Sequence, residues 1–217
     1  MLTNIAFLWK ASRKIFRKRR SVLFGRRDST ASSWSQEELH PEAWAFLRYL
    51  KRNEWAVNDG CRIVGFIASS LHSEKGLEHF VHMALSVCPE VQDVQFLIVG
   101  NAFDAYYMTY CQHIIGQSGY ASRFHRMPFE ARIELVYPAM DLVIIPNLID
   151  EGFGMTALEG LVFGKGVIAY RAGGLEEILR TTGNADWLVE KGDSSLLTAS
   201  VKGSKRLRSS EAWAQWT

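Results

Sequence analysis

A glycine-rich loop between a buried strand and a helix, residues 150–160, constrains the fold of this chain more than any other feature. The segment 141–146 before it is short, apolar and β-branched, which is typical of a fully buried parallel strand. After Gly152 an amphipathic helix is predicted. The residues expected on its buried face are spaced at 0, +3 and +7: Met155, Leu158 and Val162. In open α/β sheets ligands bind outside the carboxyl ends of the strands, so the loop predicts a binding site whose helix amides attract an anion.

Two carboxylates lie on either side of this helix start. Glu151 belongs to the loop, and Glu159 lies about five residues inside the helix, roughly 7.5 Å further along its axis. One elongated, hydroxyl-rich ligand could contact Glu151 at one end, helix amides in the middle and Glu159 at the other end. A nucleotide-diphosphate sugar has this layout of sugar, pyrophosphate and ribose. The spacing alone leaves a second interpretation open, in which Glu151 is a solvated acid near a helix dipole and Glu159 an ordinary surface residue.

At these residues the chain resembles the donor-binding domain of the family-four glycosyltransferases, which have two Rossmann-like domains in the GT-B architecture. The signature of that family is Glu, seven residues, Glu, and here the sequence from Glu151 to Glu159 reads E-G-F-G-M-T-A-L-E. A Gly-x-hydrophobic-hydrophobic strand follows at 164–169, and a Gly-Gly-x-x-Glu-Ile segment at 173–178. The resemblance covers roughly residues 60–200 and only the second of the two domains of the family.

The resemblance implies a reaction and a set of site residues. The reaction is the transfer of a sugar from a nucleotide-diphosphate sugar to an acceptor hydroxyl, with retention at the anomeric carbon. Glu151 and Lys75 are the implied catalytic residues: Glu151 holds the hydroxyls of the donor sugar, and Lys75 with the helix amides stabilises the departing diphosphate. The implied donor-binding residues, with Glu159 on the ribose and Met127 in the loop that frames the nucleobase, are Ser70, Lys75, Met127, Gly152, Phe153, Gly154, Met155, Thr156 and Glu159. Since transferases of this architecture need no metal and the chain lacks an Asp-x-Asp motif, no metal or other cofactor is expected.

One position departs from the family pattern. The family segment G-R-L-x-x-E-K-G contributes an arginine and a lysine to the donor diphosphate; residues 74–76 match it here, but Ser70 stands in the arginine position. A hydroxyl cannot supply the missing charge, so either donor affinity falls or another cation, Arg123 or Arg126, takes its place. Taken alone, a lysine at a helix start is more often solvated than functional.

From Cys61 onward, strands and helices alternate. Strands are predicted at 62–68, 94–99, 122–125, 141–145, 167–170 and 187–189, and helices at 75–87, 104–116, 129–138 and after the central loop, with helical sequence after each of the last two strands. Repeated β–α units with short connections predict an α/β fold, a doubly wound parallel sheet with helices on both faces. We therefore expect residues 60–217 to form a nucleotide-sugar-binding, Rossmann-like domain, the donor half of GT-B.

Residues 1–59 are predicted to form a basic arm, a Ser/Thr-rich linker at 29–35 and a helix over 36–54 capped by Ser35. Nine of the 25 lysines and arginines lie within residues 1–30 against a single acid, which leaves sixteen basic and twenty-two acidic residues elsewhere. The arm could lie as an amphipathic helix on an anionic membrane, or it is a solvated, partly disordered segment. No domain signature supports nucleic acid as its partner.

Three unclustered cysteines, Cys61, Cys88 and Cys111, show no metal-ligand spacing and predict buried thiols in a reducing compartment. The first nine residues carry their apolar part ahead of the charges, the reverse of a secretory signal. These features predict a cytoplasmic location, with contact to the inner face of a membrane if the arm binds lipid.

The first 60 or so residues are too short, and lack the alternating β–α units, to be the acceptor-binding domain of the resembled family. We therefore expect a donor-binding half, natural or truncated. Two functions follow from this expectation. The chain is a glycosyltransferase whose acceptor side comes from a partner chain or has been removed, or it is a non-catalytic nucleotide-sugar-binding module or inactive remnant.

Overall fold

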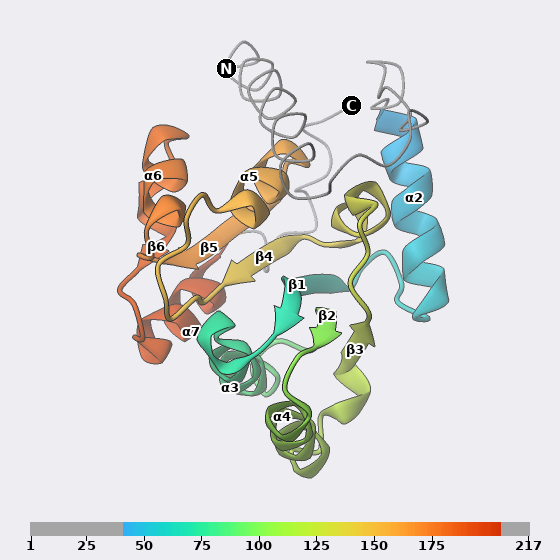
Figure 1. The fold of residues 1–217 in the computed structure, drawn as a ribbon. Helices are drawn as coiled ribbons and strands as arrows, with labels where there is room; N and C mark the ends of the chain where they lie inside the picture. Colours follow the sequence, from blue (N-terminus) through green and yellow to red (C-terminus); the bar gives the residue numbers. More distant parts are fainter. Residues whose placement is uncertain (1–40, 205–217) are drawn as a thin grey trace, which may run out of the picture.

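The computed structural model describes residues 41–204, which form one parallel sheet covered by helices (Figure 1). The sheet has six strands in the order β3-β2-β1-β4-β5-β6. In chain order they are β1 (Arg62–Leu71), β2 (Val94–Ala102), β3 (Phe124–Met127), β4 (Leu142–Ile145), β5 (Gly166–Tyr170) and β6 (Leu188–Val189). Every pairing is parallel, which confirms the predicted α/β class.

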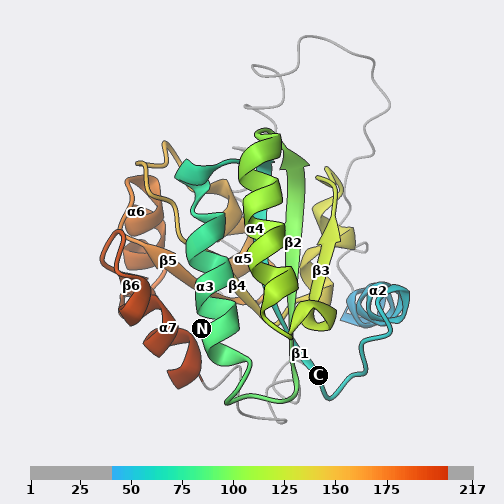
Figure 2. The same ribbon diagram turned by 90° about the horizontal axis from the view of Figure 1, so that it is seen from below.

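Helices cover both faces of the sheet, as predicted. They are α2 (Pro41–Glu54), α3 (Leu77–Val87), α4 (Ala105–Gln117), α5 (Met155–Val162), α6 (Gly174–Thr181) and α7 (Ser194–Gly203). Apolar residues of α3, α4 and α7 pack together on one face, and those of α5 and α6 pack on the other. Figure 2 shows α3 and α4 in front of the sheet and α5 behind it. None of the helices between residues 41 and 204 combines the length and the hydropathy that a bilayer crossing needs.

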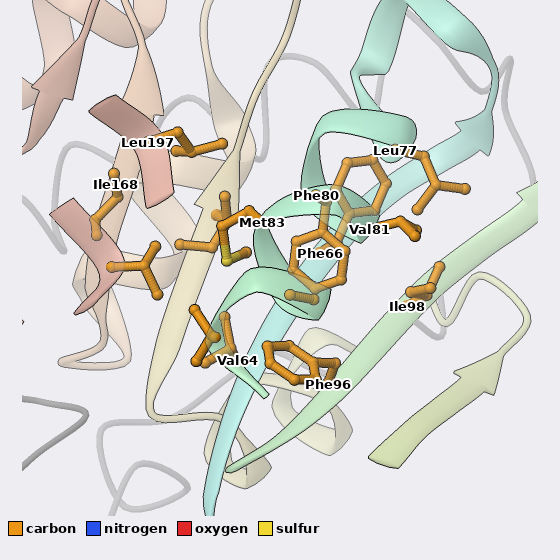
Figure 3. Packing of buried hydrophobic residues seen from close by; sticks show 14 of the residues in the cluster. Val64, Phe66, Leu77, Phe80, Val81, Met83, Phe96, Ile98, Ile168 and Leu197 are labelled. Atoms are coloured by element: carbon orange, nitrogen blue, oxygen red, sulfur yellow. The ribbon is translucent and has the colours of Figure 1, made fainter. Parts of the chain in front are cut away.

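The core on the α3 face is built around aromatic residues (Figure 3). The ring centroids of Phe66 and Phe80 lie 5.5 Å apart, and those of Phe80 and Phe96 lie 6.1 Å apart. Because a parallel strand is buried on both faces, neighbouring residues of β1 are both buried: Ile63 packs in the α5 face and Val64 in the α3 face. The strands that carry the site are therefore packed on both faces.

The strand order reverses between β1 and β4, and this switch point is where open α/β sheets bind ligands. The chain leaves β1 toward α3 on one face and leaves β4 toward α5 on the other. Gly76, with φ at 75°, lets the turn before α3 lie directly on the end of β4, because a Cβ there would be 1.9 Å from the carbonyl oxygen of Pro146. The amide of Leu148 also donates to Glu74 O at 2.8 Å. The two loops therefore form one continuous edge of the sheet.

The helix predicted over 129–138 is wrong. This segment forms two short 3-10 turns, Ile133–Leu135 and Tyr137–Ala139. The carbonyl of Pro138 accepts from Arg48 at 3.1 Å and from Lys165 at 3.2 Å. These long-range bonds hold the segment in its two turns, and Pro138 has no amide to donate to a helical carbonyl, so tertiary contacts override the local amphipathic pattern.

Two further details of the predicted elements are also corrected. The buried face of α5 contains Ala157, Leu158 and Gly160, whereas Met155 and Val162 are only partly buried. Gly160 allows this rotation, since its small size brings α5 within contact of Val167: a Cβ would lie 3.0 Å from Val167 Cγ2. The third predicted strand is shifted, because residues 121–123 form a 3-10 turn and β3 begins at Phe124.

The helix predicted over 36–54 is present as α2 from Pro41. The predicted Ser35 cap, the linker and the basic arm lie outside the described residues. At the other end of α2, Arg48 and Arg52 bind Asp141 beside the start of β4, at 3.1 and 2.8 Å. This helix is therefore fastened to the sheet by buried ion pairs.

Candidate functional site

Glu151 and Lys75 meet at the carboxyl end of β4. The ammonium of Lys75 lies 2.8 Å from Glu151 Oε2, and the amide of Asn147 donates to the same oxygen at 2.9 Å. The two charged side chains are 22% and 28% exposed, so water and ligands can reach them. Within the described part of the chain no hydrogen bond reaches the other oxygen of Glu151, Oε1. The carboxylate is thus fixed in place and keeps an acceptor for a ligand.

Backbone contacts hold the loop that carries Glu151. Its amide donates to Ala172 O at 3.2 Å, and its carbonyl accepts from the amide of Gly174 at 2.7 Å. A Cβ at Gly173 would lie 2.6 Å from Glu151 O, and one at Gly174 would lie 2.6 Å from the carbonyl carbon of Phe153. The paired glycines therefore let the start of α6 pack directly on the loop, which explains why these residue types occur there.

The helix α5 begins without a side-chain cap. Gly154 is its N-cap, with φ at 82°, and the first helical hydrogen bonds are donated to Gly154 O by Ala157 and Leu158. The amides of Met155 and Thr156 are consequently available at the positive end of the helix dipole, next to the loop that carries Glu151. Such a helix start attracts an anion.

Glu159 lies on α5 and is partly buried. Its Oε2 accepts a hydrogen bond from the hydroxyl of Tyr137 at 2.8 Å. Burial raises the pKa of Glu159 to about 7, although the bond from Tyr137 opposes the shift. Burial and the neighbouring carboxylate raise the pKa of Tyr137 well above its usual range. The second interpretation that the spacing left open, in which Glu159 is an ordinary surface residue, is therefore wrong.

The family described as glycosyl transferases group 1 matches residues 61–203. This chain belongs to the family of glycosyl transferases group 1.

Curated relatives agree with this assignment. The 2-deoxystreptamine glucosyltransferase of Streptomyces kanamyceticus is 29% identical over 133 residues, which are 60% of this chain and 33% of that protein. The 2-deoxystreptamine N-acetyl-D-glucosaminyltransferase of Streptomyces fradiae is 30% identical over 163 residues, which are 73% of this chain and 36% of that protein. The chain thus spans about a third of the length of the curated relatives that it matches.

Solved structures show the same fold. HepE of Anabaena in complex with UDP-glucose is 25% identical, with a TM-score of 0.64 over 75% of this chain and 43% of that chain. The C-terminal domain of the group 1 glycosyl transferase LpcC from Francisella tularensis is 24% identical, with a TM-score of 0.63 over 71% of this chain and 80% of that one. This group 1 transferase chain therefore has the Rossmann-like fold of a C-terminal transferase domain.

The remaining predicted site residues are distributed along the same edge of the sheet. Ser70, expected in a loop, is the second-last residue of β1, where it pairs with Asn101 of β2. Met127 ends β3 and is partly buried, packed on the α5 face. Because three strand spacings separate β3 from β4, about 14 Å lie between the Met127 and Glu151 ends of the edge. A ligand that contacts both must be elongated.

Arg123 does not replace the missing arginine. Its guanidinium donates to Cys88 O at 3.0 Å and to Val91 O at 2.8 Å, both in the segment that leads into β2. That segment lies at the amino end of the sheet, opposite the site. Arg126 is an exposed residue of β3. The prediction that Arg123 could complete the cationic clamp is therefore wrong.

Sequence reasoning missed Asn147 and Tyr137. Asn147 directly follows the apolar run that ends at Pro146, and a polar residue there was the available signal, because it follows a strand that ends at the binding edge. Tyr137 lies 22 positions before Glu159, and no local pattern connects the two residues.

The other groups of chemical interest are accounted for by packing. The thiols of Cys61, Cys88 and Cys111 are buried, as predicted, and burial raises the pKa of each, that of Cys111 to about 11. Across residues 41–204, no cluster of three or more His, Cys, Asp or Glu side chains could hold a metal ion.

Proposed function

We propose that this chain is the donor-binding half of a retaining, family-four glycosyltransferase that transfers a sugar from a nucleotide-diphosphate sugar to an acceptor hydroxyl. The observation that carries the proposal is the pair of carboxylates, Glu151 and Glu159, on either side of the uncapped start of α5, with Lys75 bound to the first. UDP-glucose in the structure of HepE, which shares the fold, supports a nucleotide sugar as the donor.

Each part of the donor has a matching group in the proposed site. The diphosphate lies at the start of α5, where the amides of Met155 and Thr156 and the ammonium of Lys75 stabilise the charge that grows as the nucleoside diphosphate departs. Glu151 Oε1 accepts from the hydroxyls of the sugar. Glu159 Oε1 accepts from the ribose.

The other contacts are weaker. The loop of Gly152 and Phe153 lies against the sugar and diphosphate, with Gly154 as the turn into the helix, and backbone groups near Met127 frame the base. Ser70 donates one neutral hydrogen bond where a family arginine would supply a charge, and this lowers donor affinity. Because Lys75 and the helix start neutralise the diphosphate, no metal or other cofactor is required.

The acceptor side lies elsewhere in this proposal. An N-terminal Rossmann-like domain or a partner chain binds the acceptor, and the protein acts in the cytoplasm with residues 1–30 on the inner face of an anionic membrane. Removing residues 1–30 is expected to abolish binding to phosphatidylserine-containing vesicles and to leave nucleotide affinity unchanged. Equal vesicle binding by the shortened chain would reject this role.

One observation favours a second candidate, a non-catalytic nucleotide-sugar-binding module. Ser70 leaves the cationic clamp incomplete, and Arg123, one of the two arginines considered as a replacement, is bound at the other end of the sheet. Turnover distinguishes the two functions, because both require binding and only the transferase produces a glycosylated product or hydrolyses the donor.

Titration calorimetry with UDP, GDP and their sugars tests the proposed site. Glu159→Ala is expected to weaken nucleotide binding by about 1–3 kcal/mol, because hydrogen-bonding groups are left unpaired. The exposed Glu177→Ala, on α6, is the matched control and should bind as the unaltered chain does. Unchanged affinity in Glu159→Ala would remove Glu159 from the site.

A further inference from the structure

We propose that Tyr137 is a positioning residue for the nucleotide: its hydroxyl holds Oε2 of Glu159 and thereby presents Oε1 to a ribose hydroxyl. This inference rests on the proposed function, since it requires that Glu159 meets the ribose. It assigns a role to a residue that belongs to neither the E-x7-E motif nor the segment of Lys75.

The hydroxyl of Tyr137 has two acceptors within reach. It lies 2.8 Å from Glu159 Oε2 and 3.3 Å from the carbonyl oxygen of Thr156. A phenol has a single proton to donate, and the shorter, charge-assisted bond to the carboxylate takes it. Among the described residues no hydrogen bond reaches Glu159 Oε1, so this oxygen keeps its acceptor capacity.

Packing fixes the ring of Tyr137. The residue is fully buried, and its ring stacks on that of Phe163 with centroids 5.4 Å apart and planes 10° apart. Phe163 directly follows α5, the helix that carries Glu159. The ring therefore cannot turn away from the carboxylate without breaking this stack, so the hydroxyl oxygen stays beside Glu159.

The backbone of Tyr137 is also fixed, by cations from two sides. Arg48 donates to Pro138 O at 3.1 Å and to Ala139 O at 3.2 Å, and Lys165 donates to Pro138 O at 3.2 Å. Arg48 belongs to α2, which precedes the family match at 61–203. The turn that carries Tyr137 is thus held before any ligand arrives, as a positioning residue requires.

Losing this hydroxyl has a specific consequence. Without the donor, the partly buried carboxylate of Glu159 either rotates away or takes up a proton, because an unpaired buried charge is unfavourable. Both changes weaken the bond to the ribose hydroxyl and leave the diphosphate contacts unchanged. The ability to distinguish a ribose from a deoxyribose should therefore be lost, whereas binding of a deoxynucleotide should hardly change.

The test is calorimetry of the full chain with UDP, 2′-deoxy-UDP and 3′-deoxy-UDP. The unaltered chain is expected to bind UDP about tenfold more tightly than the weaker of the two analogues. Tyr137→Phe should reduce that ratio to below about threefold, and Glu159→Ala should do the same. A merely structural role of the hydroxyl would change all three affinities together and leave the ratio unmoved.

Tyr110→Phe is the matched control. The hydroxyl of Tyr110, on α4, donates to Glu78 Oε1 at 3.0 Å, so this variant also removes one phenol–carboxylate bond, but away from α5. It should keep the tenfold ratio. A wild-type ratio in Tyr137→Phe would overturn the inference even if Glu159→Ala loses the ratio, and that pattern would leave the proposed function intact.

A crystal structure of the unaltered chain with UDP gives a second readout that depends on no variant. We expect the ribose within hydrogen-bond distance of Glu159 Oε1 while Tyr137 remains on Oε2. If the Tyr137 hydroxyl leaves Glu159 when UDP binds, the inference is wrong. If no nucleoside diphosphate binds the unaltered chain, the proposed function fails and the inference fails with it.

Discussion

Two ion-pair clusters lie at opposite ends of β4 and differ in what they leave unsatisfied. At the amino end, Asp141 binds Arg52 at 2.8 Å and Arg48 at 3.1 Å, and these side chains are 1–10% exposed. At the carboxyl end, Lys75 binds Glu151 at the same 2.8 Å, with both side chains more than a fifth exposed. Similar chemical groups thus form a buried structural cluster around Asp141 at one end and a partly exposed cluster of Lys75 and Glu151, the open cluster, at the other.

Both carboxylate oxygens of Asp141 are bound within the protein. Arg52 donates to the carbonyls of Asn58, Cys61 and Ala139 as well as to Asp141, and Asp141 also accepts from the amide of Ile63 at 2.8 Å. Desolvation lowers the pKa of Arg48 to about 10 and also lowers that of Arg52, with Asp141 opposing both shifts. Both oxygens of Asp141 are occupied and the three side chains are almost inaccessible to a ligand, so this cluster serves to fasten α2 to the sheet.

The cluster of Glu151 keeps spare capacity. Lys75 and Asn147 both bind one carboxylate oxygen, and the other oxygen has no partner among the described residues. The difference indicates that a charge near a strand end becomes a binding site only where the fold leaves part of its hydrogen-bonding potential unused. Four predictions test this distinction.

The largest effect on stability is expected at the buried cluster of Asp141. Asp141→Asn should lower the free energy of unfolding by about 3–5 kcal/mol, because two buried guanidinium groups lose their counter-charge. Glu151→Gln, the matched change at the open cluster, should alter it by less than about 1 kcal/mol, since exposed ion pairs contribute little. Urea unfolding followed by circular dichroism measures both. Similar losses in the two variants would end the distinction.

Glu159 is intermediate between the two clusters, since it is partly buried and has one partner. Its pKa is about 7 in the folded chain against the ordinary value of 4.5, so the folded state holds a proton that the unfolded state has lost between these pH values. The free energy of unfolding should therefore fall as pH rises from 4.5 to 7, by up to about 3 kcal/mol from this group alone.

Glu159→Gln should remove that contribution and flatten the pH dependence of stability. Urea unfolding at pH 5, 6, 7 and 8 tests this, with the exposed Glu177→Gln as the control that keeps the wild-type slope. If Glu159→Gln and the unaltered chain lose stability in parallel between pH 5 and 7, then Glu159 ionises like an ordinary surface acid and does not occupy an intermediate position.

The backbone under the open cluster provides the third prediction. Gly173→Ala places a Cβ 2.6 Å from Glu151 O at a residue with φ of 57°. We expect a loss of about 1–3 kcal/mol in stability together with weaker UDP binding, because the loop of Glu151 must move. Gly183→Ala has φ at 73° and no atom within 4 Å of the new Cβ, so it adds the strain without the displacement. The control should lose about 1 kcal/mol and bind UDP normally; equal UDP affinities in the two variants would show that the loop tolerates the change.

The same contrast explains which parts of the structure the sequence could predict. Local patterns predicted the strands, their parallel arrangement and the loop of Glu151, because periodicity and glycine positions act within a few residues. The suggestion that Arg123 replaces the missing arginine took no account of the strand direction: Arg123 directly precedes β3, so it lies at the amino end of the sheet, away from the site.

Contacts between residues far apart in the sequence could not be predicted from local patterns. Arg52 binds Asp141 from 89 positions away, and Tyr137 binds Glu159 from 22 positions away. No periodicity encodes such pairs, because their geometry depends on how α2 packs beside β4 and how α5 packs against the turn of Tyr137. The helix predicted over 129–138 was wrong for the same reason, because contacts with another element, the bonds from Arg48 of α2 to the carbonyls of Pro138 and Ala139, hold this segment in short turns. The missed residues are therefore those whose partners lie on other elements.

Lys75→Met is expected to have the smallest effect on stability. It should also separate stability from binding most clearly, because UDP affinity falls while the free energy of unfolding hardly changes. Removing its exposed ammonium should change the free energy of unfolding by less than about 1 kcal/mol, like most partly exposed ion pairs. Lys202→Met is the matched control, because its ammonium binds Glu90 at 2.6 Å with a similar exposure of 25%.

The two lysine variants should differ only when nucleotide is added. Lys75→Met is expected to bind UDP at least about tenfold more weakly, since a charge-assisted bond to the diphosphate is lost, and the affinity of the unaltered chain should fall more steeply with added salt than that of the variant. Lys202→Met should match the unaltered chain in both respects. The two lysines form similar ion pairs. If both variants lose UDP affinity, long-range charge attracts the nucleotide. If only Lys75→Met loses UDP affinity, the diphosphate binds at the open cluster.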